Sequence, residues 1–300
     1  MQKKYSPKIG VIGISGMWSS DHLADVIQGK TGFRMVINME EVLFDMEQGT
    51  VTFQGQSLLD LDALIIKKLG AEYTPDLLSR LEVLRYVEDC GVQIFSRPES
   101  INKVLDRLSC TNQLFRSDIP IPSTVVTESM ELAEQTARSM GKCILKPLYT
   151  SKARGMVVLD ENNNIREKLE AYRTSGNRTF YLQKWIQIPG KDLGIVFLGG
   201  NYLATYARVA NADSWNTTTR SGGHYEPYTP NPEIIELAKK AQEPFELDFT
   251  CVDLVEAPEG PRIFEVSAFG GFKGLKDAHG IDAAELYVDH VLEGLRHGKN

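Results

Sequence analysis

One stretch near the C-terminus, "FTCVDLVEAPEGPRIFEVSA", constrains the fold most strongly. Two runs of strand-forming residues flank the turn-rich pentapeptide "APEGP", which predicts an antiparallel β-hairpin. Folded symmetrically about Glu259, this hairpin places Asp253 directly opposite Glu265, with Cβ atoms about 5 Å apart. Like charges at that separation are destabilising unless a cation lies between them. The segment therefore predicts either a divalent-cation site or a solvated acidic face.

The side chains around this pair favour the cation. Strand alternation places Glu265 and Ser267 on one face of the second strand. The apolar residues expected on its other face are Phe264, Val266 and Ala268. Carboxylate and hydroxyl oxygens suit Mg²⁺, with Mn²⁺ as the alternative. We therefore predict Asp253, Glu265 and Ser267 as metal ligands. The Gly-rich loop "FGGFKGL", which carries Lys273, follows at once.

The first third of the chain alternates between strand and helix patterns. Strands are expected in "KIGVIGI", "RMVINM", "DALIIKKLG" and "VQIFS", with helices in "SSDHLADVIQG" and "PDLLSRLEVLRYVEDCG" and a hairpin in "VLFDMEQGTVTF". Such alternation predicts a mostly parallel sheet. Gly10, Gly13 and Gly16 are spaced as GxxGxxG rather than GxGxxG, which favours strand-to-helix turn chemistry over dinucleotide binding.

A domain boundary is expected near "SRPES", and the chain then changes character. "INKVLDRLSCTNQLFRSD" reads as one helical segment. "CILKPLYTSKARGMVVLD" reads as two strands around a basic loop, with Lys146 inside the first strand, and "TFYLQKWI" as a further strand. Strand patterns dominate from Lys191 onward. The fold class is thus α/β, and the expected domains are residues 1–97, 98–186 and 187–300.

Charge and cysteine usage exclude several classes of function. The net charge is −7 and the isoelectric point is near 5.4. An acidic chain is a poor binder of nucleic acid or anionic membranes, because those partners need a basic face. The four cysteines have neither zinc-site spacing nor the density of a disulfide framework. With no signal-like or membrane-spanning apolar run, we expect a cytoplasmic protein without a nucleic-acid or membrane partner.

The order of these features resembles the ATP-grasp superfamily, and within it the RimK-type carboxylate–amine ligases, from about Ser96 to Leu292. The variant "EVSAFGGFKGL" also resembles the ATP-grasp members of the bacterial GAK system. The resemblance implies a Rossmann-like pre-ATP-grasp domain followed by a two-part α+β ATP-grasp domain. It also implies an ATP- and Mg²⁺-dependent ligase that forms an acyl phosphate from a carboxylate, which an amine then attacks. A peptide or protein terminus is one candidate substrate, and a homo-oligomer is an alternative to a monomer.

The resemblance also assigns roles by position. Lys146 would grip the ATP phosphates, Asp192 would bind the ribose, and backbone groups of Lys184 and Trp185 would bind the adenine. The nucleotide-binding set is Arg107, Lys146, Ser151, Lys152, Gly155, Lys184, Trp185, Asp192, Asn216, Thr217 and Thr218. The catalytic set is Arg208, Lys146 and Arg220, and the side chains expected to bind substrate carboxylates are Arg220 and Lys273.

Five positions depart from the family pattern. Ser267 and Thr218 stand where the family usually has Asn, and Arg107 replaces a Lys. Lys184 replaces a hinge acid, and Gly194 replaces an Arg. These changes keep two alternatives open: a small-molecule kinase on the same scaffold, or a nucleotide-binding regulator with little turnover.

Single residues also have ordinary structural explanations. Lys146 alone would suit a strand-end lysine with its stem buried and its ammonium in water, and Arg208 alone would suit a surface strand residue. The functional interpretation depends on the joint order and spacing of the residues.

Overall fold

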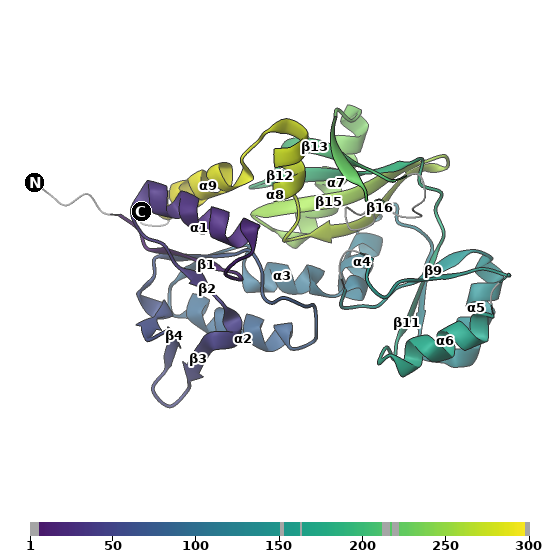
Figure 1. Ribbon diagram of the computed structural model, residues 1–300, viewed down its shortest axis with the longest axis horizontal. Helices are drawn as coiled ribbons and strands as arrows, with labels where there is room; N and C mark the ends of the chain where they lie inside the picture. Colours follow the sequence, from purple (N-terminus) through teal and green to yellow (C-terminus); the bar gives the residue numbers. More distant parts are fainter. Residues whose placement is uncertain (1–5, 151–152, 163, 212–216, 218–221, 298–300) are drawn as a thin grey trace, which may run out of the picture.

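The computed structural model describes residues 6–150, 153–162, 164–211, 217 and 222–297, which form four sheets with helices around them (Figure 1). Residues 9–95 contain a parallel sheet of order β2-β1-β6-β7, as the alternation predicted. Its elements are β1 (Ile9–Ile12), α1 (Trp18–Thr31), β2 (Val36–Ile37), β6 (Ala63–Ile66), α2 (Leu77–Asp89) and β7 (Gln93–Phe95).

The glycines of the first strand–helix connection serve packing and turn geometry. A Cβ added to Gly13 would lie 2.7 Å from Ser20 Oγ, so close approach of α1 to β1 needs glycine there. Gly16 has φ of +83°, a backbone conformation that favours glycine. Both observations support the prediction of strand-to-helix turn chemistry.

The expected hairpin at "VLFDMEQGTVTF" is present. It forms the three-stranded antiparallel sheet of order β3-β4-β5, which projects from the parallel sheet (Figure 1). Its strands are β3 (Val42–Asp45), β4 (Thr50–Phe53) and β5 (Gln56–Ser57).

The single helix predicted after the boundary is wrong, because the chain breaks at Asp106. This residue is extended, with φ −103° and ψ 148°, and its carboxylate accepts a hydrogen bond from the amide of Ser109. The break separates α3 (Pro98–Leu105) from α4 (Arg107–Arg116). A helix N-cap at Asp106 makes Arg107 the first residue of a new helix, and its side chain enters the site described below.

A small lobe, residues 124–184, follows. Its antiparallel sheet has the order β10-β9-β11-β8, and two helices cover it. The lobe has its own core, which includes Leu145, Leu169 and Leu182. Its elements are β8 (Thr124–Thr127), α5 (Met130–Met140), β9 (Cys143–Leu145), β10 (Val157–Leu159), α6 (Ile165–Thr174) and β11 (Phe180–Lys184).

The C-terminal region is a five-stranded antiparallel sheet of order β14-β13-β12-β15-β16. Strand β14 lies in "RSGGHYEPY", which the sequence did not predict to be a strand. The elements are β12 (Lys191–Leu198), β13 (Asn201–Val209), β14 (His224–Tyr228), α7 (Pro232–Gln242), β15 (Phe249–Ala257), β16 (Gly260–Ser267), α8 (Phe272–His279) and α9 (Ala283–His297). Across the described ranges, no helix combines the length and apolar character needed to cross a membrane.

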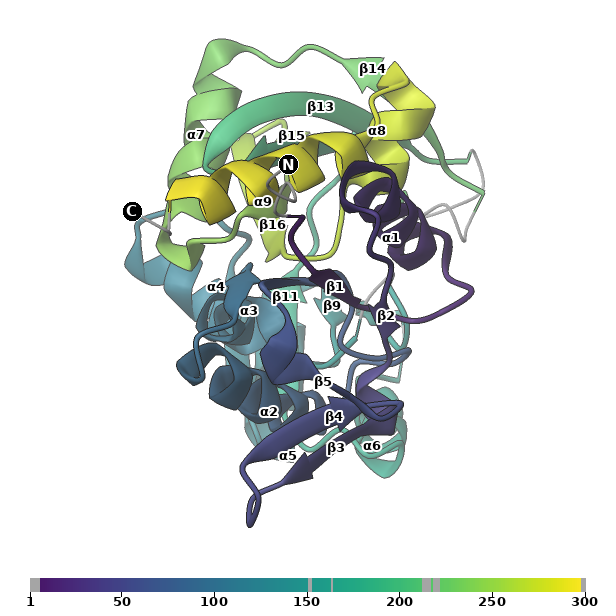
Figure 2. The same cartoon turned by 90° about the vertical axis from the view of Figure 1, so that its left-hand side faces the viewer.

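The N- and C-terminal sheets share their cores, and we call the part outside the lobe the main body. Helix α9 packs against α1 (Figure 2), with Lys30 Nζ 2.6 Å from Asp289 Oδ1. One shared core contains Ile66 and Leu254, one from each sheet. Helices α3 and α4 also contribute to that core. The boundaries after residues 97 and 186 fall between the sheets, and we propose them as the limits of three structural units.

Candidate active site

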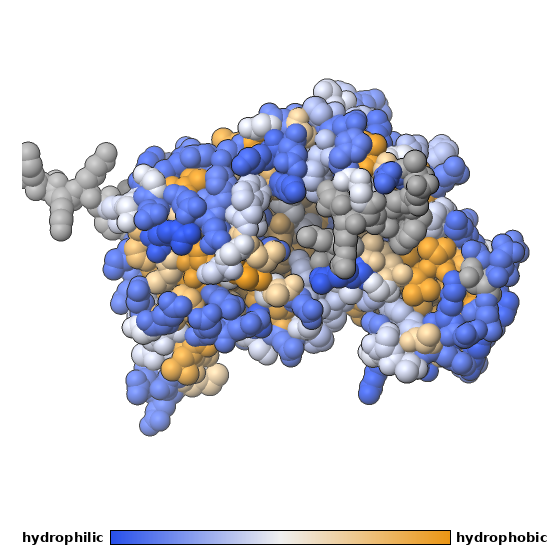
Figure 3. All heavy atoms as spheres, in the orientation of Figure 1, coloured by the Kyte–Doolittle hydropathy of each residue, from blue (hydrophilic) through white to orange (hydrophobic). Residues whose placement is uncertain are grey.

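A cavity of about 330 Å³ lies where the lobe meets the main body. Figure 3 shows the surface indented between these two parts. Residues from all three larger sheets and their connections line the cavity, among them Lys68, Lys146, Gln183, Trp185, Asp192, Arg208, Asp253, Glu265 and Ser267. The predicted metal ligands Asp253, Glu265 and Ser267 therefore line the same cavity as Lys146 and Arg208.

The predicted carboxylate pair is confirmed, since Asp253 is the direct cross-strand partner of Glu265. The turn has two residues, Pro258 and Glu259, because Ala257 pairs with Gly260. A hairpin without irregularity would then pair Asp253 with Phe264. A β-bulge between Asp253 and Leu254 shifts the register by one residue and restores the pairing with Glu265.

Because of the bulge, the face predicted for the Phe264 side chain is wrong. Strict alternation placed this ring on the face opposite Glu265, but Phe264 lines the same cavity as Glu265 and Ser267. An extra residue at a bulge locally breaks the two-residue alternation. The ring centroid of Phe264 lies 5.3 Å from Lys146 Nζ.

Arg208 connects the carboxylates at this end of the cavity. It is the cross-strand partner of Asp192, and its guanidinium donates to both carboxylate oxygens of that residue. Its Nη2 also lies 3.0 Å from Asp253 Oδ2. Burial raises the pKa of Asp253 to about 7, opposed by Arg208 and reinforced by Glu265 and Asp192. Asp192, the predicted ribose ligand, is 4% exposed and bound to Arg208.

Lys146 follows the last residue of β9 and is buried up to its ammonium group. Its amide donates to Tyr181 O at 3.0 Å, and its Nζ donates to Gln183 Oε1. Gln183 is itself held, since its Nε2 donates to Thr124 Oγ1 at 3.0 Å. Burial, together with Arg107, lowers the pKa of Lys146 to about 7. The buried ammonium excludes the alternative of a strand-end lysine with its head in water.

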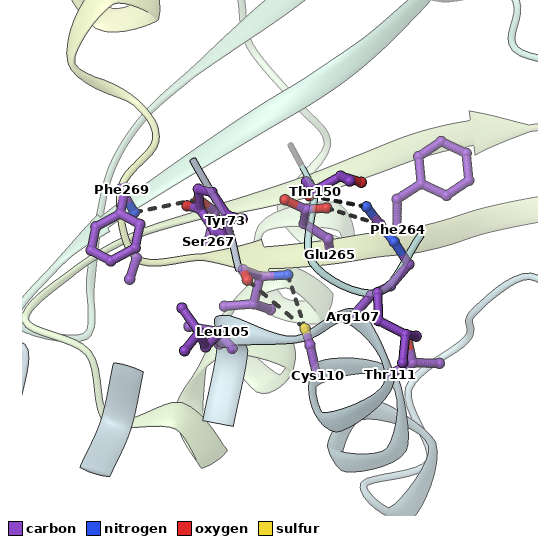
Figure 4. Close-up of a pocket in the computed structure, with 14 residues that line it drawn as sticks. Tyr73, Leu105, Arg107, Cys110, Thr111, Thr150, Phe264, Glu265, Ser267 and Phe269 are labelled. Carbon is purple, nitrogen blue, oxygen red and sulfur yellow. Dashed lines mark hydrogen bonds and ion pairs between the residues drawn. The ribbon is translucent and has the colours of Figure 1, made fainter. Parts of the chain in front are cut away.

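Arg107 connects the lobe to β16, the strand that carries the predicted metal ligands Glu265 and Ser267 (Figure 4). Its Nη1 lies 3.2 Å from Glu265 Oε2, while Nε donates to Pro147 O and Nη2 to Thr150 O. The guanidinium that the family resemblance assigned to nucleotide binding thus donates to three acceptors within the protein. The contacts also border a second, smaller cavity beside Glu265 and Ser267.

The connection after β11 uses the amides of the two residues predicted to bind adenine for bonds within the protein. The amide of Lys184 donates to Ser123 O at 2.8 Å, and that of Trp185 donates to Lys142 O at 3.1 Å. Neither amide hydrogen is left for a purine base. Trp185 nevertheless lines the cavity, and Lys142 Nζ lies 3.8 Å from its ring centroid.

Of the remaining predicted residues, three lie in the described part of the chain and five lie outside it. Thr217 is buried and lines the cavity, and Gly155 has φ of +66° in the basic loop. Lys273 is exposed on α8 and is not among the described residues that line the cavity. The predicted residues that lie outside the described part of the chain are Ser151, Lys152, Asn216, Thr218 and Arg220.

Gln183, Lys68 and Tyr73 are among the cavity residues that sequence reasoning missed. Gln183 holds the Lys146 ammonium, and its place beside the predicted adenine linker was the available signal. Lys68 and Tyr73 reach the cavity from the segment after β6, and nothing local in the sequence marks them.

The donor set fits a hard divalent cation. Two carboxylates face each other across β15 and β16, and Ser267 lines the same cavity two residues beyond Glu265. Glu265 contributes to the raised pKa of Asp253, and a cation between the two carboxylates would remove this repulsion. No group of three His, Cys, Asp or Glu side chains suited to a metal occurs among the described residues, so phosphate or water oxygens would complete the coordination.

Comparison with solved structures identifies the fold. A solved RimK-domain ATP-grasp protein from Sphaerobacter thermophilus matches with a TM-score of 0.74 at 19% identity, over 94% of this chain and 98% of that one. The ATP-grasp ligase PsnB, solved with a minimal precursor, matches with a TM-score of 0.75 at 15% identity, over 96% and 99%. These similarities show the ATP-grasp fold.

Sequence comparison identifies the family. Residues 104–291 match the RimK-like ATP-grasp domain, and the chain belongs to that family. It is 27% identical over 274 residues to a tetrahydromethanopterin:alpha-L-glutamate ligase of Methanosarcina acetivorans, covering 82% of this chain and 84% of that protein. The protein is an ATP-dependent ligase that joins a carboxylate to an amine through an acyl phosphate.

Proposed function

We propose that the cavity binds Mg²⁺-ATP and that its own side chains align the γ-phosphoryl group with a substrate carboxylate. The direct pairing of Asp253 with Glu265 in the cavity that also contains Lys146 carries this assignment. Asp253, Glu265 and Ser267 would hold Mg²⁺, with Mn²⁺ as a substitute, and the cation would supply charge neutralisation for the phosphates.

The buried Lys146 ammonium is held by Gln183, so it can bind phosphate oxygens without a large reorganisation. A polyanion beside Lys146 would favour its charged form and raise the pKa from about 7. Arg208 is fixed by Asp192 and Asp253, and its guanidinium would stabilise charge at the transferred phosphoryl group. Arg107, bound to Glu265, would position that metal ligand.

The base would be bound by apolar surface and by the chain beyond Trp185. Ile186 and Ile188 line the cavity, and the amides of Lys184 and Trp185 are already used. We therefore propose that the backbone of Ile186 forms the hydrogen bonds to the edge of the adenine base. Asp192 would remain within reach of the ribose if Arg208 shifts toward phosphate.

The names of the relatives support candidates for the two substrates. Curated relatives are named as ligases of alpha-L-glutamate, which supports L-glutamate or a similar amino acid as the amine. A structural neighbour was solved with a precursor peptide, which supports a peptide or protein carboxylate as one candidate acceptor. We also propose a cytoplasmic location, no nucleic-acid partner, and assembly into a homo-oligomer as an alternative to a monomer.

Trapping of the acyl phosphate tests the ligase assignment. The purified protein is incubated with Mg²⁺-ATP, candidate acids and hydroxylamine, and hydroxamate is measured with phosphate release. We expect hydroxamate with the correct acid and ATP-dependent coupling once L-glutamate replaces hydroxylamine. Stable phosphorylated product without coupling would indicate a kinase. Tight Mg²⁺-ATP binding without any turnover would indicate a regulator, and both outcomes would overturn the ligase proposal.

A further inference from the structure

Lys67, the residue that directly follows β6, carries an ammonium group that is buried inside the main body. The residue is 2% exposed, and its Nζ lies 3.8 and 5.8 Å from the ring centroids of Phe272 and Phe249. Nζ donates a hydrogen bond to Phe269 O at 3.0 Å, and no ion pair joins it to any residue of the described ranges. Because a buried charge without a counter-charge costs free energy, packing alone does not explain a lysine at this position.

The carbonyl that Lys67 holds belongs to the short loop between β16 and α8. Residues 269–271 of this loop line the cavity. The amide of Phe269 donates to Ser267 Oγ at 3.4 Å. A single residue, Phe269, therefore connects Lys67 through its carbonyl with the predicted metal ligand Ser267 through its amide. A displacement of that carbonyl would also displace the amide that contacts the serine hydroxyl.

The loop lies close to the C-terminal sheet. A Cβ added to Gly270 would lie 3.2 Å from Cys251 Cβ, and one added to Gly271 would lie 3.2 Å from the Phe249 ring. Gly271 also has φ of +93°. Glycine permits such close approach and such dihedrals, but it loses more conformational freedom on folding than any other residue. A loop with two glycines therefore depends on contacts such as that of Lys67 to keep one conformation.

The Ser267 hydroxyl needs this orientation because the side chain is short. Ser267 is the last residue of β16, and the direction of its Cβ–Oγ bond decides whether the oxygen reaches a cation. The amide of Phe269 is a donor that favours one direction. The support behind it is firm, since the amide of Lys67 donates to Ile12 O, at the end of β1, at 2.9 Å. The N-terminal sheet thus anchors the loop that follows the predicted metal ligands.

We propose that Lys67 is a positioning residue for the metal site: its ammonium group holds Phe269, and Phe269 orients the Ser267 hydroxyl toward the cation. This inference rests on the proposed function, because it takes Ser267 as a ligand of Mg²⁺. Hydrogen bonds from a charged donor are stronger than those between neutral groups, so an ammonium suits this task better than a hydroxyl or an amide. Lys67 acts through the loop, since it is not among the described residues that line the cavity.

The affinity for Mg²⁺ tests this role without any turnover. A non-hydrolysable ATP analogue is titrated by calorimetry into the full-length protein at a series of Mg²⁺ concentrations, which gives the apparent Kd of the cation. Lys67→Met removes the donor, while its thioether can still pack against the two aromatic rings. We expect the apparent affinity for Mg²⁺ to fall roughly tenfold, the low end for one hydrogen bond to a charged group.

A double-mutant cycle with Ser267→Ala separates positioning from a general loss of structure. Ser267→Ala should itself weaken Mg²⁺ binding. Adding Lys67→Met should then cause no further loss, because the ligand that Lys67 positions is already missing. The proposal is overturned if the two losses multiply in the double variant, or if Lys67→Met binds Mg²⁺ as wild type does.

Lys276→Met provides a matched control on α8. Lys276 also lies beside an aromatic ring, 5.0 Å from the centroid of Trp18, but it is exposed and does not contact the loop. It should bind Mg²⁺ as wild type does, and a loss equal to that of Lys67→Met would contradict the proposal. Weaker Mg²⁺ binding by Lys67→Met, without hydroxamate formation from any acid, would support it while counting against the ligase assignment. A wild type that binds the analogue equally with and without Mg²⁺ would refute both.

Discussion

Two buried lysines in different regions of the molecule, Lys146 in the lobe and Lys67 in the main body, invite comparison. Each is at most 7% exposed, and burial lowers the pKa of each to about 7. Their surroundings differ. Lys146 lines the cavity with Glu265 and Arg208, whereas Lys67 lies against a carbonyl and two aromatic rings. A pKa lowered by desolvation therefore does not by itself identify a phosphate-binding lysine, and the proposed role of Lys146 rests on the cavity that it lines.

The largest expected difference between the two lysines is in catalysis. Lys146→Met should lower kcat/KM for ATP by roughly 10²–10³-fold, the loss typical of one positioned donor. It should also remove most of the rise in Tm produced by Mg²⁺-ATP. Lys67→Met should reduce both values much less than Lys146→Met, since Lys67 does not itself line the cavity. Equal losses in the two variants would refute the distinction.

The next difference concerns how the two regions are packed. Leu182 and Leu254 are both fully buried, in the cores of the lobe and the main body. Either leucine-to-alanine change should cost about 2–5 kcal/mol in the unit that contains it. Hydrogen exchange should accelerate only within residues 124–184 for Leu182→Ala, and in both the N- and C-terminal sheets for Leu254→Ala. Faster exchange in β1 and β6 of the lobe variant would show that the regions are not separate.

A third difference is expected in how the stability of wild type and of the Lys146 variant changes with pH. A lysine that releases its proton near pH 7 when folded, but near 10.5 when unfolded, makes the unfolded chain bind more protons between these values. Wild-type stability should therefore rise with pH in that window. Lys146→Met loses only the part of this dependence that Lys146 contributes, while Lys67 keeps its own. The gain in Tm of the variant over wild type, without nucleotide, should therefore be largest at pH 6 and shrink by pH 9. A gain that grows with pH would contradict the assignment of a buried ammonium.

The smallest effect is expected at the contact between the regions. Arg107→Lys keeps the charge but cannot reach Glu265, Pro147 and Thr150 together. We expect roughly a tenfold loss in kcat/KM, the scale of one or two hydrogen bonds. The apparent affinity for Mg²⁺, measured by titrating turnover, should weaken with it. Arg116→Lys, at the other end of α4, provides a matched control.

Local sequence patterns predicted most of the elements and the hairpin with its carboxylates. They failed where one residue changed the geometry. Asp106 divided an expected helix because its side chain caps a new one, and Phe264 changed face because of a bulge. Helical periodicity and strand alternation describe average geometry, so neither detects a cap or an inserted residue inside a regular pattern.

The amino-acid order by itself predicted the alternating strands and helices of the N-terminal region, the hairpin that carries Asp253 and Glu265, and the family resemblance, because each is read from neighbours along the chain or across one short turn. The bulge that completes the pairing of these two carboxylates was not predicted by any local pattern. The fold decided which charges meet over long separations. Arg208 reaches both Asp192 and Asp253, Arg107 reaches Glu265, and Lys68 enters the cavity from another sheet. Packing of the sheets sets those distances, and no local pattern encodes them.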